Sequence, residues 1–118
     1  MDALLSALSL RDIGYHFPDS DAKYKDADSM KLLEKVISLI SEKGYKINNL
    51  SAVIMAEKPK LSPFIPTITA NLAKALSVET ECVGIGATTL EGLGFIGREE
   101  GICVRAAVTV IKSDYTDK

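Results

Sequence analysis

Residues 84–101 constrain the fold more than any other part of the chain, because most of its eight glycines fall within this stretch. Apolar runs flank the stretch on both sides, so we expect a loop that connects two buried strands. Glycines let a backbone approach a ligand closely and adopt positive φ angles. The same stretch contains the pair Thr88 and Thr89, together with Glu91 and Arg98.

The chemistry of this glycine-rich segment leaves two interpretations open. Threonine hydroxyls, loop N–H groups and a guanidinium are donors that suit phosphate oxygens. A divalent cation between Glu91 and a phosphate would reconcile the carboxylate with such an anion site. The alternative is a glycine-rich turn in which the threonines cap backbone groups and the charges face water.

Composition indicates an ordinary globular protein. The chain has 118 residues, of which 47% are hydrophobic and 25% charged, and we expect one domain at 1–112 followed by a polar tail at 113–118. A net charge of −2 argues against a nucleic-acid partner, and apolar runs too short to span a bilayer argue against a membrane. Cys82 and Cys103 are expected to be buried reduced thiols, which together with the lack of a secretory signal favours the cytoplasm.

Hydrophobic periodicity and end signals predict a mixture of helices and strands. The expected helices are 2–10, 29–43 and 66–76. The expected strands are 45–56, 81–86 and 102–112. Asp28 or Ser29 can cap the second helix and Gly44 follows its end. This order predicts an α+β or α/β layered domain, with a small sheet backed by helices on one side.

Polar residues concentrate in three expected loops, at 12–21, 56–62 and 84–98. Taken together they would form three walls of one pocket for a phosphate and a nucleobase, with Lys60 and Arg98 as cations. Glu91 and Asp12 would approach a metal ion. The aspartates at 12–21 do not follow an EF-hand register, so their spacing alone favours a solvated turn. The one histidine, His16, is expected to be an exposed loop residue.

Several motifs then occur in a characteristic order: DIG at 12–14, FPDSD at 17–21, ADS at 27–29, AEKPK at 56–60 and ATTLEGLGFIGR at 87–98. Their combination resembles the 2-C-methyl-D-erythritol 2,4-cyclodiphosphate synthases of non-mevalonate isoprenoid biosynthesis. The resemblance extends from about residue 2 to residue 112.

This resemblance implies a lyase with a cytidine diphosphate-linked small-molecule substrate. The enzymes convert 4-diphosphocytidyl-2-C-methyl-D-erythritol 2-phosphate to the cyclodiphosphate and CMP, by attack of the 2-phosphate on the β-phosphorus. No covalent enzyme intermediate is needed, so catalysis rests on positioning and charge neutralisation. The resemblance also implies a homotrimer with sites at the subunit interfaces, and two kinds of divalent cation: zinc, and magnesium or manganese.

The motif match also implies residue roles. Thr89 is expected to stabilise the transition state, and Glu91 to bind magnesium through the phosphates. Substrate contacts are expected from all three loops, at Asp12, Ile13, Gly14, Phe17, Pro18, Asp19, Ser20, Asp21, Ala56, Glu57, Lys58, Pro59, Lys60, Leu61, Ser62, Thr88, Thr89, Leu90, Glu91, Phe95 and Arg98.

The sequence departs from the family at its beginning. The family's zinc ligands lie upstream of the position where this chain starts, and a single histidine at a variable position cannot replace them. We therefore expect an N-terminally truncated chain without a zinc site and with an exposed sheet edge. Two alternatives to a working synthase follow: a catalytically impaired fragment that binds cytidine diphosphate, and a trimeric interaction scaffold.

Overall fold

A three-stranded sheet with the order β2-β1-β3 runs through the computed structural model, which describes residues 1–24 and 27–115. The strands are β1 (Tyr45–Met55), β2 (Val83–Thr88) and β3 (Cys103–Lys112). β1 and β2 are parallel, in a register that pairs Leu50 with Val83 and Met55 with Thr88. Because parallel strands end at the same edge of a sheet, the segments that follow β1 and β2 begin side by side.

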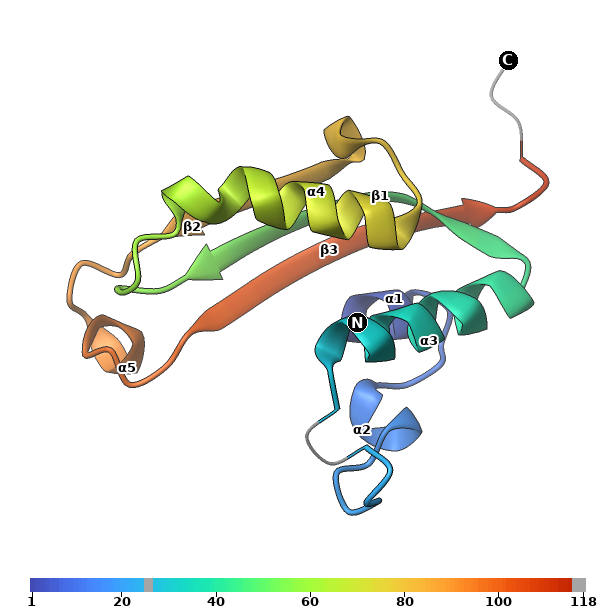
Figure 1. Ribbon diagram of the computed structural model, residues 1–118, viewed down its shortest axis with the longest axis horizontal. Helices are drawn as coiled ribbons and strands as arrows, with labels where there is room; N and C mark the ends of the chain where they lie inside the picture. Colours follow the sequence, from blue (N-terminus) through green and yellow to red (C-terminus); the bar gives the residue numbers. More distant parts are fainter. Residues whose placement is uncertain (25–26, 116–118) are drawn as a thin grey trace. The chain divides into compact units, whose positions relative to one another are not determined.

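Strand β3 is antiparallel to β1. The N–H of Ser113 donates to the carbonyl of Gly44 at 2.8 Å, and the side-chain amide of Asn48 donates to the hydroxyl of Thr109 at 3.0 Å. As residue numbers rise along β1, the numbers of the residues opposite them on β3 fall, which is the pattern of an antiparallel pair. The arrows in Figure 1 follow these directions. The sheet is therefore mixed, and the fold is α+β.

Two compact units divide the chain, Met1–Asn48 with Val108–Lys118, and Asn49–Ala107. The first unit contains the helices α1 (Asp2–Ala7), α2 (Ile13–His16) and α3 (Ser29–Glu42). Helix α3 confirms its predicted start, because a carboxylate oxygen of Asp28 accepts from the N–H of Met30 at 2.9 Å. Gly44, with φ of 84°, follows its end as expected.

The core of the first unit includes the apolar face of α3, where Leu33, Val36 and Ile40 are buried. Val36 and Ile40 are fully buried, as is Leu5 of α1, which packs against α3. Helix α1 is three residues shorter than the predicted 2–10. Its end is explained by left-handed backbone at Ser9, with φ of 58°, and by the N–H of Leu10 turning back to the carbonyl of Leu5.

The second unit packs α4 (Ile65–Leu76) on β2, along one face of the sheet, as Figure 1 shows. The single-turn helices η1 (Ser62–Phe64) and η2 (Thr80–Cys82) flank α4. Pro66 lies in the first turn of α4, where its missing N–H costs no hydrogen bond. The buried apolar side chains of this unit are Ala52, Ala56, Ala73, Leu76, Val83 and Ile96.

The glycine-rich segment is more regular than the predicted loop. β2 continues to Thr88, two residues beyond the expected end at 86, and a short helix α5 (Gly94–Gly97) forms further on. The threonine pair therefore stands at the end of a strand, which fixes its position. Positions 25–26 of the expected loop at 11–28, and positions 116–118 of the expected tail, lie outside the described residues. Among the helices of residues 1–24 and 27–115, none is both long and apolar enough to cross a membrane.

Candidate functional site

A pocket of about 330 Å³ opens where β1 and β2 end, in the second unit. Its lining comes from the segment that follows β1 and from the end of β2 with the next residue: Ala56, Glu57, Pro59, Lys60, Leu61, Ser62, Ala87, Thr88 and Thr89. Two of the three predicted loops thus contribute to one pocket. Eight of these nine residues are among the predicted substrate contacts, and Ala87 is the additional one.

The two loops diverge from a shared starting point. Beyond the last paired residues of the sheet, the N–H of Ala56 still donates to the carbonyl of Thr88 at 3.0 Å. Ala56 is 6% exposed and extends the core beneath the pocket. The parallel ladder of β1 and β2 therefore extends as far as Ala56, the first residue of the pocket lining.

A carboxylate crosses from the first of these loops to the second. Oε1 of Glu57 accepts from the N–H of Leu90 at 2.7 Å, and from that of Gly92 at 3.4 Å. The side chain is half-buried. A short hydrogen bond from an N–H to an ionised carboxylate is among the stronger ones in proteins.

The backbone N–H groups of the turn at 90–93 are all used inside the protein. Besides the two bonds to Glu57, the N–H of Glu91 donates to Oγ1 of Thr89 at 3.3 Å, and that of Leu93 to the carbonyl of Leu90 at 3.0 Å. Thr89 therefore caps the turn, as the second interpretation of this segment expects, and it also lines the pocket. Donors for a phosphate must come from side chains here.

The threonine hydroxyls differ in what they can still offer. Oγ1 of Thr88 donates its hydrogen to the carbonyl of Thr89 at 3.2 Å, so its lone pairs remain available. Oγ1 of Thr89 accepts from Glu91 instead, so its hydrogen remains available to donate. Thr89 can thus act as a donor toward the pocket, and Thr88 as an acceptor.

The turn itself has an unusual backbone. Glu91 and Gly92 both have positive φ angles, of 53° and 79°, and a non-glycine residue seldom adopts this region. The turn also lies directly on α5. A Cβ added to Gly97 would meet the carbonyl carbon of Gly92 at 2.2 Å, so only glycine fits there.

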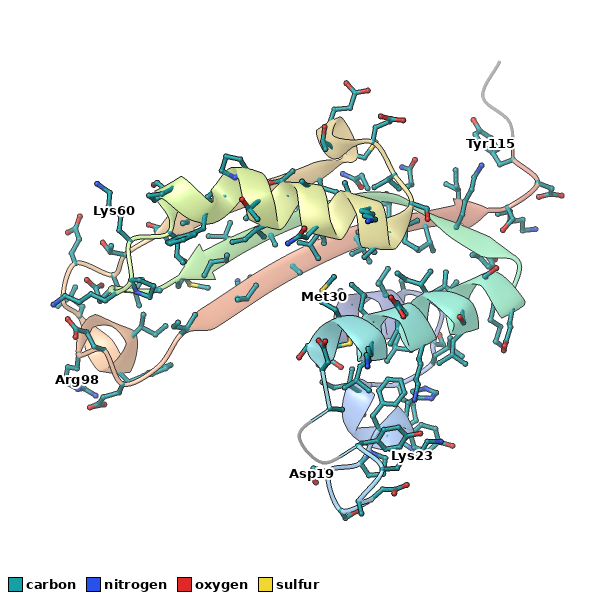
Figure 2. The ribbon with its side chains drawn as sticks, viewed as in Figure 1. Asp19, Lys23, Met30, Lys60, Arg98 and Tyr115 are labelled. Carbon is teal, nitrogen blue, oxygen red and sulfur yellow. The ribbon has the colours of Figure 1, made fainter. Side chains whose placement is uncertain are left out.

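The two predicted cations, Lys60 and Arg98, differ in their contacts, and Lys58 is a third basic residue of these loops. Lys60 lines the pocket and has an exposed side chain. Lys58 pairs with Glu99 at 3.5 Å, and both groups are largely exposed. Arg98 makes a two-point contact with Glu100, at 2.9 and 3.2 Å. Figure 2 draws Lys60 and Arg98 well apart, on either side of the two loops.

The loop at 12–21 belongs to the first unit and is partly helical. Asp12 caps α2, accepting from the N–H of Tyr15 at 2.9 Å, while the N–H of Ile13 donates to the carboxylate of Asp2 at 2.8 Å. Asp21 accepts from the N–H of Lys23, forming the turn that its spacing predicted. These carboxylates therefore organise their own loop.

The prediction of an exposed His16 is wrong. Its ring is half-buried at the end of α2, and Nε2 lies 2.6 Å from the carbonyl of Leu10, to which it donates. The flanking rings of Tyr15 and Phe17 explain the burial, with centroids 5.0 and 6.2 Å from the imidazole. The sequence could not reveal this, because a single turn of helix leaves no periodic signal.

The ligands needed for zinc do not come together in the described chain. No group of three or more His, Cys, Asp or Glu side chains within residues 1–24 and 27–115 could hold a metal ion. The zinc implied by the resemblance therefore does not fit these residues. Glu91 is a different case, since its exposed carboxylate beside the pocket suits a magnesium ion held mainly by phosphates.

Comparison with known sequences agrees with the resemblance that the motifs indicated. The chain matches the YgbB family over residues 1–111. It belongs to this family. A 2-C-methyl-D-erythritol 2,4-cyclodiphosphate synthase of Desulfitobacterium hafniense is 54% identical over 112 residues, which cover 95% of this chain and 71% of that relative. A synthase of the same name from Synechocystis is 55% identical, with 95% and 70% covered.

Solved structures of YgbB-family relatives have the same fold. The bifunctional IspDF of Campylobacter jejuni is 40% identical with a TM-score of 0.88, and the match covers 92% of this chain and 30% of that one. The Plasmodium falciparum IspF in its CDP complex is 29% identical with a TM-score of 0.83, and the match covers 96% and 67%. The predicted α+β fold is thus confirmed by the architecture and by these neighbours.

Proposed function

We propose that this protein takes part in forming 2-C-methyl-D-erythritol 2,4-cyclodiphosphate, with release of CMP from the cytidine diphosphate-linked substrate. The observation that carries the proposal is the single pocket built from the segments 56–62 and 87–89. These are the segments that would hold the cytidine and the diphosphate. Relatives that are over 50% identical across 112 residues are named as synthases of this cyclodiphosphate, which supports the proposal.

The proposed step is a phosphoryl transfer within one substrate molecule. An oxygen of the 2-phosphate forms a bond to the β-phosphorus, the bond from that phosphorus to the bridging oxygen breaks, and CMP leaves with the bonding electrons. Charge builds on the phosphoryl oxygens in such a transition state. The free hydrogen of the Thr89 hydroxyl would donate to one of these oxygens.

Other residues would hold the substrate in place. Lys60 would neutralise phosphate charge from the rim of the pocket. Glu91 would bind a magnesium or manganese ion together with the nucleotide phosphates, and that ion would supply charge neutralisation when bound. Asp12 and the segment 17–21 would hold the methylerythritol end, and Phe95 and Arg98 would add contacts.

The assembly proposed is a homotrimer. In the second unit, the sheet face opposite α4 carries exposed apolar side chains, with Val53 at 42% and Val104 at 55% exposure. An apolar sheet face of this kind favours burial in an interface. Light scattering coupled to size-exclusion chromatography measures the mass, and a monomer at micromolar concentration would contradict the assembly.

A second candidate is binding of a cytidine nucleotide without turnover. It is favoured by the way the His, Cys, Asp and Glu residues of the described ranges are dispersed, without a zinc ligand set. Calorimetry with CDP and an assay of CMP release from the full substrate separate the two candidates. CMP release supports the synthase, and CDP binding without CMP release supports the binding protein. If neither CMP release nor CDP binding is observed, both candidate functions are refuted.

Two variants link the result to the pocket. Thr89→Val removes the hydroxyl at nearly constant volume and should lower CMP release by about 10²–10³-fold, as for other single donors to a developing oxyanion. Thr89→Ser keeps the hydroxyl and should retain most of the rate. Equal loss in both variants would show that the hydroxyl is not the group that matters.

A further inference from the structure

We propose that Glu57 is a positioning residue, which fixes the turn carrying Thr89 and Glu91 against the loop carrying Lys60. The expected effect on nucleotide binding rests on the proposed function, whereas the contact of Glu57 with Leu90 and Gly92 does not. The motif match placed Glu57 among the residues that touch the substrate. Its geometry assigns it a different task.

The contact joins the two halves of the pocket. Glu57 follows β1 by two residues, whereas Leu90 and Gly92 follow β2, and the hydrogen bonds connect positions 33 and 35 residues apart. The 2.7 Å bond to Leu90 is close to the short limit for an N–H donor and a carboxylate. One oxygen of Glu57 thus holds two N–H groups of the opposite loop.

The turn has internal hydrogen bonds, from Leu93 to Leu90 at 3.0 Å and from Glu91 to Thr89 at 3.3 Å, but these leave the N–H groups of Leu90 and Gly92 to an outside acceptor. Glycine adopts the positive φ of position 92 freely, but the left-handed conformation of Glu91 costs free energy that surrounding contacts must offset. The bond from the N–H of Glu91 to Thr89, at 3.3 Å, is long. The carboxylate of Glu57 supplies the short bond that fixes the turn from outside.

Of the two residues that would handle the diphosphate, one sits next to this turn and the other within it. Thr89 immediately precedes Leu90, and Glu91 lies between the two N–H groups that Glu57 holds. Releasing these groups would displace the threonine hydroxyl and the glutamate together. The pocket residues from 59 to 62, which would hold the cytidine, take no part in these two hydrogen bonds. Glu57 should therefore affect binding of the β-phosphate more than binding of the nucleoside.

Three substitutions separate positioning from direct contact with the nucleotide. Glu57→Gln keeps the length and an accepting oxygen but loses the charge. Glu57→Asp keeps the charge but is shorter by one methylene, about 1.5 Å, so it cannot reach Leu90. Glu57→Ala removes the group. Glu81→Ala is the matched control, because Glu81 is an exposed carboxylate of the same unit.

The test measures CMP and CDP affinity of the full chain by calorimetry with magnesium present, and hydrogen exchange at the amides of Leu90 and Gly92 by NMR. Glu57→Ala and Glu57→Asp should weaken CDP binding about tenfold and CMP binding less than about twofold. Both should speed exchange at the two amides about tenfold or more. Glu57→Gln and the control should stay close to the unmodified protein.

Three results would overturn the proposal. Equal weakening of CMP and CDP would mean that Glu57 touches the nucleoside. Retention in Glu57→Asp with loss in Glu57→Gln would mean that its charge matters and its reach does not. Unchanged exchange in Glu57→Ala would mean that the turn does not need it. If the unmodified protein binds neither nucleotide, the proposed function fails, while the exchange measurement still decides the role of Glu57.

Discussion

Replacing Gly97 by alanine should disrupt the turn that borders the pocket. The added Cβ would lie 2.2 Å from the carbonyl carbon of Gly92, 2.7 Å from its oxygen and 2.8 Å from its Cα. Real Cβ contacts essentially never fall below 3.0 Å and are ordinary from 3.4 Å, so the backbones at Gly92 and Gly97 must separate by 0.8 Å (3.0 minus 2.2 Å) to 1.2 Å (3.4 minus 2.2 Å). No side chain rotation can relieve this, because all three atoms belong to the backbone.

The cost has two parts. Overpacking of this size costs about 1–3 kcal/mol, and moving Gly92 away from Glu57 weakens a hydrogen bond to a charged acceptor worth about 1.5–3 kcal/mol when it is fully lost. The bond from the N–H of Gly92 to Glu57 is already long, at 3.4 Å, so only part of that energy is lost and we expect a total cost of about 2–4 kcal/mol. For a chain of this size, this corresponds to a fall in Tm of about 10 °C or more.

Thermal unfolding followed by circular dichroism measures the fall, with Gly14→Ala as the control. Gly14 lies in α2, and beyond its own helix backbone and chain neighbours its added Cβ would come no closer than 3.6 Å, to Oδ1 of Asp12, so the Tm of Gly14→Ala should change by less than about 2 °C. A Gly97→Ala protein that melts within about 2 °C of the unmodified chain would refute the reasoning. It would mean that the turn moves at no cost and is not held as described.

Three further outcomes are expected. Ile40→Ala should lower the free energy of unfolding by about 2–5 kcal/mol and Ile40→Val by about 0.5–1.5, measured by urea denaturation, since Ile40 is fully buried; equal losses would contradict a cavity effect. Asp28→Ala should cost about 1 kcal/mol through the lost cap while Asp28→Asn costs little, and a neutral alanine would contradict the cap. Lys60→Met should weaken CDP binding about tenfold and reduce its salt dependence. An unchanged CDP affinity by calorimetry would show that Lys60 does not contact the nucleotide.

The parts of the fold that were predictable carry local signals. Helix α3 has an apolar period, a capping aspartate and a terminal glycine, and each predicted feature is present. The two loops after β1 and β2 were grouped correctly because they follow strands. Their shared pocket then follows from the parallel pairing of these strands, in the register of Leu50 with Val83.

The parts that escaped prediction depend on distant contacts or on very short elements. Helix α2 has four residues, too few for a hydrophobic period to appear. The end of β2 at Thr88 follows from its pairing with Met55, which local propensity does not encode. The bridge from Glu57 to Leu90 joins residues 33 positions apart, so no spacing rule could have found it.

The internal use of the N–H groups at 90–93 has an electrical consequence for whatever enters the pocket. The turn presents no row of amide dipoles to an incoming anion, and the carboxylates of Glu57 and Glu91 add negative potential beside it. Under the proposed function, a bare nucleoside diphosphate would be disfavoured beside these carboxylates, whereas its complex with a divalent cation would arrive with much of its charge neutralised. The species recognised should therefore be the complex of the nucleotide with the cation. EDTA should abolish nucleotide binding by removing the cation, without itself binding in the pocket.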